Sequence, residues 1–158
     1  MNWNKLKRDF LKVARIAGQK FISSELHIEP AKTRFPKKRL TQGVYIFMLK
    51  NKCLKVGRAG PKSHSRFGSQ HYIYDRTSSR LANSIISNRN TLRNVLSISR
   101  GSVRRLNRRN IGAWIERNTT RQNFLMPADK GPLALSLLEV FLQCRLKPVF
   151  EGKSEIVS

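Results

Sequence analysis

The sequence predicts one α+β domain, with a small central antiparallel sheet of three strands flanked by helices. The length of 158 residues suits a single domain. Two short runs rich in β-branched and aromatic residues follow each other closely, as in a hairpin, whereas apolar residues elsewhere recur at helical spacing. The hydrophobic fraction of 39 % is enough for a core of modest size and too high for a disordered chain.

A basic amphipathic helix is predicted over residues 2–21, followed by an extended basic arm that reaches residue 40. The apolar residues that recur at helical spacing are Trp3, Leu6, Phe10, Val13 and Ala17. In most proteins such a helix packs on its own domain, but it can also lie on a membrane or act as a transit peptide. We therefore expect residues 1–40 to be an N-terminal addition to a domain of residues 41–158.

A hairpin is predicted where two strand-like runs, residues 44–49 and 53–57, are separated by a few polar residues. The other elements expected, in chain order, are short helices near 65–72, at 81–86 and at 91–98, a third strand around 113–116, and a long helix over 131–147. Pro132 suits the first turn of that last helix, and Pro148 would end it.

The chain is strongly basic, with 32 Lys and Arg residues against 9 Asp and Glu, a net charge of +23 and a pI near 11.4. Its natural partner is a polyanion, either nucleic acid or an anionic membrane. Residues 76–110, an Arg-rich insertion, contain no acidic residue. They form either a solvated segment or a face for nucleic acid, and the planar arginine fork favours the second. The candidate nucleic-acid contacts are Lys37, Lys38, Arg39, Arg76, Arg80, Arg104, Arg105, Arg108 and Arg109.

Several classes of protein and site are not expected. No run approaches the roughly 18 apolar residues of a membrane span, and the N-terminus lacks the pattern of a secretion signal. Cys53 and Cys144 form no motif, so we expect reduced thiols in a cytoplasmic protein without a membrane partner. The histidines lack the spacing of zinc ligands, and the loop at 57–63 lacks the glycine spacing of a phosphate-binding Walker loop.

The informative pattern begins in the predicted hairpin and ends in the last helix. The tripeptide Gly43-Val44-Tyr45 opens the first strand, and Lys55-Val56-Gly57 ends the second, with Lys55 ten residues after Tyr45. Arg58 follows Lys55 by three residues and Arg66 follows it by eleven, and Glu139 lies in the middle of the last helix. In order and spacing, this pattern resembles the signature of the GIY-YIG nuclease family.

The resemblance covers roughly residues 43–150 and departs from the family's signature in three places. Val44 stands where the family has isoleucine. Lys55 stands in place of the second tyrosine, which is similar to some restriction enzymes of the family. The polar residue, usually asparagine, that the family carries beyond its helical glutamate has no clear counterpart here, although Glu151 stands nearby.

The resemblance implies a role in phosphodiester hydrolysis for each matching residue. Tyr45 would be the general base, directly or through a metal-bound water, and Lys55 would hold the phenolate or the nucleophile in place. Arg58 and Arg66 would bind and neutralise the scissile phosphate. Glu139 would ligate one divalent cation, Mg²⁺ or Mn²⁺, which takes few carboxylates and keeps waters for phosphate oxygens.

The residues also make chemical sense without the family. A tyrosine, with a usual pKa of about 10, accepts a proton only if nearby cations stabilise the phenolate. Lys55 and Arg58 would supply those cations, and His71 or Tyr72 would contact phosphate or relay a proton. Glu139 has an alternative role, because a carboxylate in a mostly apolar helix often forms a salt bridge with a nearby arginine.

The sequence therefore predicts a metal-dependent endonuclease that hydrolyses DNA, most of all double-stranded DNA. With one site in each chain, double-strand cleavage would need a homodimer or two successive visits. A restriction or defence role follows by analogy with small family members that carry the lysine variant. The alternative is a nucleic-acid-binding protein without enzymatic activity, such as a ribosome-associated or architectural protein, which would have a similar composition.

Overall fold

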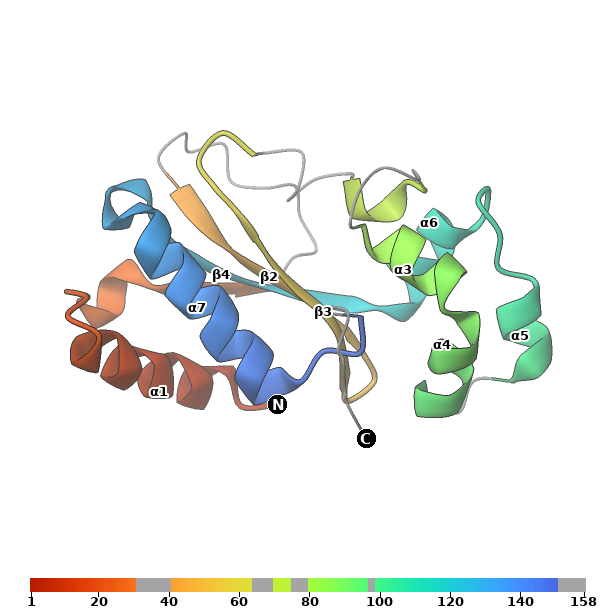
Figure 1. Ribbon diagram of the computed structural model, residues 1–158, viewed down its shortest axis with the longest axis horizontal. Coiled ribbons are helices and arrows are strands. Elements are labelled where there is room, and N and C mark those ends of the chain that lie inside the picture. Colours follow the sequence, from red (N-terminus) through yellow and green to blue (C-terminus); the bar gives the residue numbers. More distant parts are fainter. Residues whose placement is uncertain (31–40, 64–69, 75–79, 97–98, 151–158) are drawn as a thin grey trace.

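The structure is an antiparallel sheet with helices on its two faces (Figure 1). The computed structural model describes residues 1–30, 41–63, 70–74, 80–96 and 99–150. In these residues the sheet has four strands in the order β1-β4-β2-β3. Their bounds are β1 (His27–Pro30), β2 (Thr41–Leu49), β3 (Lys52–Ala59) and β4 (Thr120–Pro127). The predicted α+β class is confirmed, and the sheet has one strand more than predicted.

The predicted hairpin is confirmed as β2 and β3, which pair in antiparallel register. The chain reverses after β2 at Lys50, whose φ of 53° lies in the left-handed region. Residues 42–49 of β2 are all buried, because β2 is a central strand with helices over both faces. A register shift between Phe47 and Met48 marks a bulge in the pairing with β3.

The predicted strand around 113–116 is wrong, because these residues lie in helix α6 (Ile111–Asn118). Ile111 and Ile115 are both fully buried, and their spacing of four residues places them on one face of a helix. The strand of this region is β4, which begins at Thr120. Both segments contain β-branched or aromatic residues, so tertiary packing decides which of them forms the strand.

The additional strand, β1, lies within the segment that is predicted to be an extended basic arm. It pairs antiparallel with β4, and Ile28 lies opposite Phe124. Leu26, directly before β1, is fully buried in the core. The strand is short, mostly exposed and ends in Pro30, which suits the edge of a sheet. The N-terminal residues therefore complete the sheet on the side of β4.

Helices α1 (Trp3–Ile16) and α7 (Gly131–Leu146) lie together over one face of the sheet (Figure 1). Phe10 is fully buried, and its ring centroid lies 5.7 Å from that of Phe21 and 5.6 Å from that of Phe141. Of the roles left open for the N-terminal helix, packing on its own domain is the one observed. Among the described residues, no helix has both the length and the apolar character needed to cross a bilayer.

The opposite face carries the helices of the Arg-rich segment, together with α6 (Figure 1). Their bounds are α3 (Leu81–Ser87), α4 (Arg89–Leu96) and α5 (Arg100–Arg104). The helix predicted at 81–86 is confirmed as α3, and the one predicted at 91–98 corresponds to α4. Leu81, Ile85 and Leu92 are fully buried and share a core with Phe47. The Arg-rich segment therefore contributes to the core as well as to the surface.

Replacing Phe10 by alanine should destabilise the whole domain, because it opens a cavity between α1 and α7. We expect a loss of about 3–5 kcal/mol in the free energy of unfolding, measured by urea denaturation. The control is Leu133→Ala on α7, whose side chain is 75 % exposed and whose replacement should change the free energy by less than about 0.5 kcal/mol. Unfolding of α1 alone, with the sheet as stable as before, would contradict the assignment.

An ion pair between Glu25 and Lys130 joins the N-terminal segment to the start of α7. The Lys130 Nζ lies 2.7 Å from Glu25 Oε1, and the Ile22 backbone N–H donates to Oε2 at 2.8 Å. The hydrogen bond with Lys130, followed by that with Ile22, lowers the pKa of Glu25. A carboxylate whose pKa is lowered by folding stabilises the fold above its unfolded pKa and ceases to do so as the pH falls through its folded pKa.

The Glu25→Gln variant should therefore be less stable than the wild type at neutral pH, and the difference should shrink as the pH falls below about 4.3, the usual pKa of a glutamate. Urea denaturation of both proteins over this pH range measures the difference. A difference that does not depend on pH would mean that the charge of Glu25 is irrelevant to stability.

Candidate active site

The predicted site residues on the hairpin are divided between the two faces of the sheet. Paired residues of antiparallel strands point to the same face, and faces alternate along a strand. Tyr45 pairs with Gly57, and Phe47 with Lys55, so Tyr45 and Lys55 share the face covered by α3 and α6. Arg58 points to the other face, where its side chain contacts α7.

Each of the two glycines of the motif is required for a different steric reason. A Cβ atom at Gly57 would lie 2.3 Å from the Tyr45 hydroxyl oxygen and 2.5 Å from Cζ, so only glycine leaves room for the phenol. A Cβ atom at Gly43 would lie 2.3 Å from the Phe124 carbonyl oxygen in β4. Gly43 therefore permits the close approach of β2 and β4, and Gly57 accommodates Tyr45.

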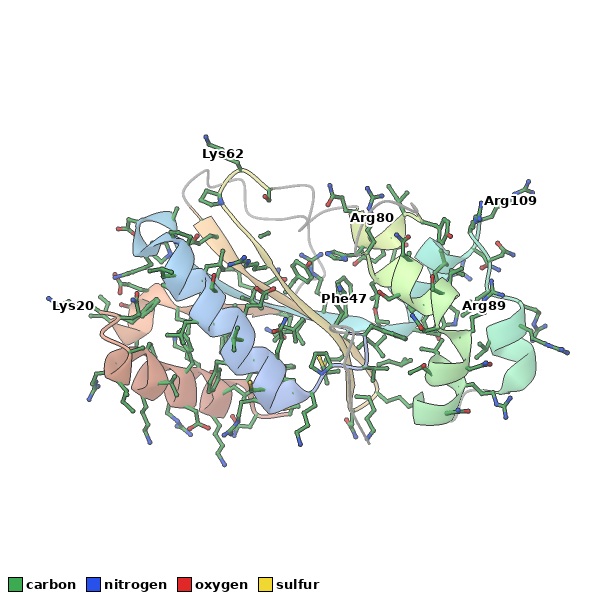
Figure 2. All side chains as sticks on the ribbon, in the orientation of Figure 1. Lys20, Phe47, Lys62, Arg80, Arg89 and Arg109 are labelled. Atoms are coloured by element: carbon green, nitrogen blue, oxygen red, sulfur yellow. The ribbon has the colours of Figure 1, made fainter. Side chains whose placement is uncertain are left out.

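His71, a candidate for phosphate contact or proton relay, packs against Tyr45. It lies in the 3-10 turn η2 (Gln70–Tyr72) and is 2 % exposed. Its ring centroid is 4.4 Å from that of Tyr45 and 5.2 Å from that of Phe47, which Figure 2 labels where the sheet meets the α3 side of the molecule. The rest of the helix predicted near 65–72, including Arg66, lies outside the described residues.

Arg121 of β4 also belongs to this cluster, although sequence reasoning missed it. Its guanidinium carbon lies 5.7 Å from the ring centroid of Tyr45 and 5.5 Å from that of Phe47. Its Nε donates a hydrogen bond to Asn123 Oδ1 at 3.1 Å. Burial lowers the pKa of the Arg121 guanidinium, and attraction to Tyr72 and Tyr45 opposes that effect.

The signal that could have found Arg121 is the alternation along β4, which places Arg121 and Asn123 on the face of Tyr45. The strand is predicted at 113–116 instead of 120–127, so this alternation is not recognised from the sequence. Lys55 is 4 % exposed and lies diagonally across from Tyr45, a separation that a long side chain can span. We define the tyrosine cluster as Tyr45, Phe47, Lys55, His71, Tyr72, Arg121 and Asn123.

Glu139 lies on the face opposite the tyrosine cluster. Its Oε2 is 3.2 Å from the Arg58 Nε, and Arg58 Nη1 also donates to the Ser136 hydroxyl. The alternative considered for Glu139, an ion pair with a nearby arginine, is therefore observed. β3 is an edge strand, so the two faces of the sheet meet at its outer edge. On one face Gly57 lies below the Tyr45 hydroxyl, and on the other face the next residue, Arg58, contacts Glu139.

The candidate nucleic-acid contacts lie mainly at the end of the molecule formed by α5 and α6. Arg104, Arg105, Arg108 and Arg109 are exposed, and Figure 2 shows Arg109 pointing away from the body of the molecule. The guanidinium carbon of Arg108 lies 4.8 Å from the Tyr74 ring centroid. Arg80 is half-buried at the start of α3. The other candidates, Lys37, Lys38, Arg39 and Arg76, lie outside the described residues.

A metal centre with several protein ligands is not present in the described part of the chain, where no group of three or more His, Cys, Asp or Glu side chains gathers. Glu139, 19 % exposed at the edge of β3, is the carboxylate nearest to Arg58. A single carboxylate fits a cation such as Mg²⁺, which keeps waters for phosphate oxygens, and does not fit a structural zinc ion.

Comparison of the chain with protein-family models, with curated proteins and with solved structures finds no match. A buried phenol close to an arginine and a histidine, with a buried lysine on the same face of the sheet, can exchange a proton. The neighbouring edge of the sheet carries a guanidinium and a carboxylate.

Replacing Gly57 by alanine should push the Tyr45 phenol out of its position and destabilise the domain by about 1–3 kcal/mol, as overpacking does. The matched control is Gly60→Ala, where nothing lies within 4 Å of the added Cβ and the change should stay within about 0.5 kcal/mol. In a Tyr45→Ala background the cost of Gly57→Ala should nearly disappear, because the clashing ring is gone. An equal cost in both backgrounds would disprove the contact.

Proposed function

We propose that the protein is a divalent-metal-dependent endonuclease that hydrolyses phosphodiester bonds of DNA. The observation that carries the proposal is the placement of Tyr45, with its hydroxyl over Gly57, its ring 4.4 Å from His71, and Arg121 nearby. The absence of a side chain at Gly57 leaves room for the phenol at this position, in contact with the histidine and close to the arginine.

Tyr45 would accept a proton from the attacking water on its hydroxyl oxygen. The phenolate needed for this is favoured by positive charge close by and disfavoured by burial. Lys55 on the same face and Arg121 behind the ring supply positive charge. His71, in ring contact with Tyr45, would relay the proton or contact phosphate, as would Tyr72.

Phosphate would bind at the outer edge of β3, between the two faces. Arg58, whose side chain is 45 % exposed, would contact the scissile phosphate together with Arg66. Glu139 would hold one Mg²⁺ or Mn²⁺ ion, which when bound supplies Lewis-acid stabilisation of charge on phosphate oxygens. Glu139 would then exchange its contact with Arg58 for the cation.

The basic surface would bind the rest of the DNA. Exposed arginines on α5 and in the segment before α6 provide additional phosphate contacts outside the tyrosine cluster, and such contacts fix position without reading sequence. Double-stranded DNA is the expected substrate, with a homodimer or two visits needed to cut both strands. A restriction or defence role in the cytoplasm is the physiological setting that the lysine variant suggests.

A second candidate function is nucleic-acid binding without catalysis. The observation that favours it is the ion pair between Arg58 and Glu139, which accounts for the carboxylate without any metal. In that case the tyrosine cluster would serve only the stability of the sheet, and the basic surface would be the whole function.

Cleavage of plasmid and linear DNA with Mg²⁺, with Mn²⁺ and with a chelator separates the two candidates. The endonuclease should cut only with the metal, and Tyr45→Phe and Glu139→Gln should each reduce the rate by about 100-fold or more. Tyr74→Phe and Glu116→Gln, which change residues outside the tyrosine cluster and the β3 edge, should cut normally. All variants should keep salt-sensitive DNA binding.

If folded wild-type protein binds DNA but cuts neither duplex nor single strands with either metal, the binding protein is the correct candidate. If cleavage persists undiminished in Tyr45→Phe, the nuclease has another proton acceptor, and the role assigned to Tyr45 is wrong. Circular dichroism of each variant ensures that a loss of activity does not come from unfolding.

A further inference from the structure

A cavity of about 330 Å³ lies on the α7 face of the sheet, next to the Arg58–Glu139 pair. It is lined by Gln42, Arg58, Gly60, Pro61, Ala128, Gly131, Pro132 and Leu135. In Figure 2, the loop after β3 that carries Lys62 rises beside the N-terminal end of α7. Ligand sites in proteins have volumes of about 300–1,000 Å³, so this cavity is at the small end of the range and suits a ligand with a single ring system.

Gln42 places a fixed hydrogen-bond acceptor at this cavity. Its side chain is almost fully buried, and Nε2 donates to the carbonyl oxygens of Pro127 at 3.3 Å and Gly131 at 3.0 Å. Two carbonyl acceptors on the amide nitrogen determine which way the amide is oriented. The carbonyl oxygen Oε1 is therefore the atom that Gln42 can offer to a ligand.

Arg58 places donors at the same cavity. Its guanidinium is held by Glu139 and by Ser136, which involve Nε and one N–H of Nη1. The fork of N–H groups on a guanidinium exceeds these two contacts, so donors remain for a ligand. Because Glu139 offsets the charge of Arg58, the cavity combines a donor and an acceptor with little net charge.

The larger side chains that complete the lining, those of Pro61, Pro132 and Leu135, are apolar. Inside the cavity a phosphate would meet the carbonyl oxygen of Gln42, which repels an anion. The scissile phosphate of the proposed function would instead contact the exposed part of Arg58 from the outer edge of β3. A nucleobase offers what this cavity can bind: a planar ring for the apolar walls, an N–H for Gln42 and an acceptor for Arg58.

We propose that this cavity binds a single nucleobase turned out of the strand beside the cleavage site. This proposal rests on the proposed function, because the nucleobase would come from the DNA that the nuclease cuts. Turning a base out costs unpairing and unstacking energy, which is lowest at weak base pairs or in single strands. The cavity would therefore give the protein a preference for the base at one position of its substrate.

The direct test needs no DNA cleavage. Deoxynucleosides are titrated into the folded protein, and the backbone amide signals of Gly60 and Gly131 are followed by NMR. We expect both signals to shift with deoxyadenosine, deoxycytidine or deoxyguanosine, and not with N3-methylthymidine, which has acceptors but no ring or amino N–H. Inorganic phosphate is titrated in the same way, to test the alternative that the cavity binds an anion.

The variant that tests the location is Gly60→Leu, because Gly60 lines the cavity and an added Cβ there has nothing within 4 Å, so a bulky side chain can be introduced at the cavity without a clash. Its matched control is Gly101→Leu on α5, where the added Cβ is equally unobstructed. Nucleoside binding should weaken at least tenfold in Gly60→Leu and stay unchanged in Gly101→Leu.

Three results would overturn the proposal: no nucleoside shifts the two glycines, inorganic phosphate alone shifts them, or Gly60→Leu binds nucleosides as the wild type does. Its failure can be told from failure of the proposed function. A protein that cuts DNA and ignores nucleosides keeps the nuclease and loses the base cavity, whereas a protein that binds nucleosides without cutting keeps the cavity and loses the nuclease.

Discussion

The antiparallel register of β2 with its two neighbours determines on which face of the sheet each candidate side chain of the strands lies. Pairing of Tyr45 with Gly57 puts the phenol over a residue without a side chain, and pairing with β4 brings Arg121 to the same ring. A slip of one residue would send Tyr45 to the α7 face and exchange the two sets of side chains. The glycines at 43 and 57 make the register specific, because no larger residue fits at either position.

The chain manages a large excess of positive charge by using its few carboxylates to join elements. Asp9 of α1 accepts from Arg145 of α7 at 2.9 Å, Glu25 pairs with Lys130, and Glu139 pairs with Arg58 of β3. Each of these pairs links segments that are distant in sequence. Many of the other basic residues in the described part of the chain are exposed, where repulsion is weakened by salt and where a polyanion can neutralise the charge.

Local signals account for the parts of the structure that could be predicted. The hairpin and the helices α1, α3 and α7 follow from runs and periodicities within a few residues, and proline marks both ends of α7. The wrong prediction around 111–127, where a strand is expected at 113–116 but the strand is β4, has a non-local cause. Both segments contain β-forming residues, and only tertiary packing decides which of them forms the strand. Because β4 was not predicted, Arg121 was not recognised as part of the site. β1 was not predicted because a short edge strand has little periodicity.

The sequence alone determined the class of partner and the chemistry on offer. A net charge of +23 favours a polyanionic partner, and the spacing of the two tripeptides predicts a hairpin that carries a tyrosine and a lysine on one face. The tertiary structure decided which of these groups meet: it gathers Tyr45, His71 and Arg121 on one face and pairs Glu139 with Arg58 on the other. The physical reason is that faces and contacts depend on which strands pair and which helices cover them, and those pairings join residues too far apart in the chain for local patterns to record.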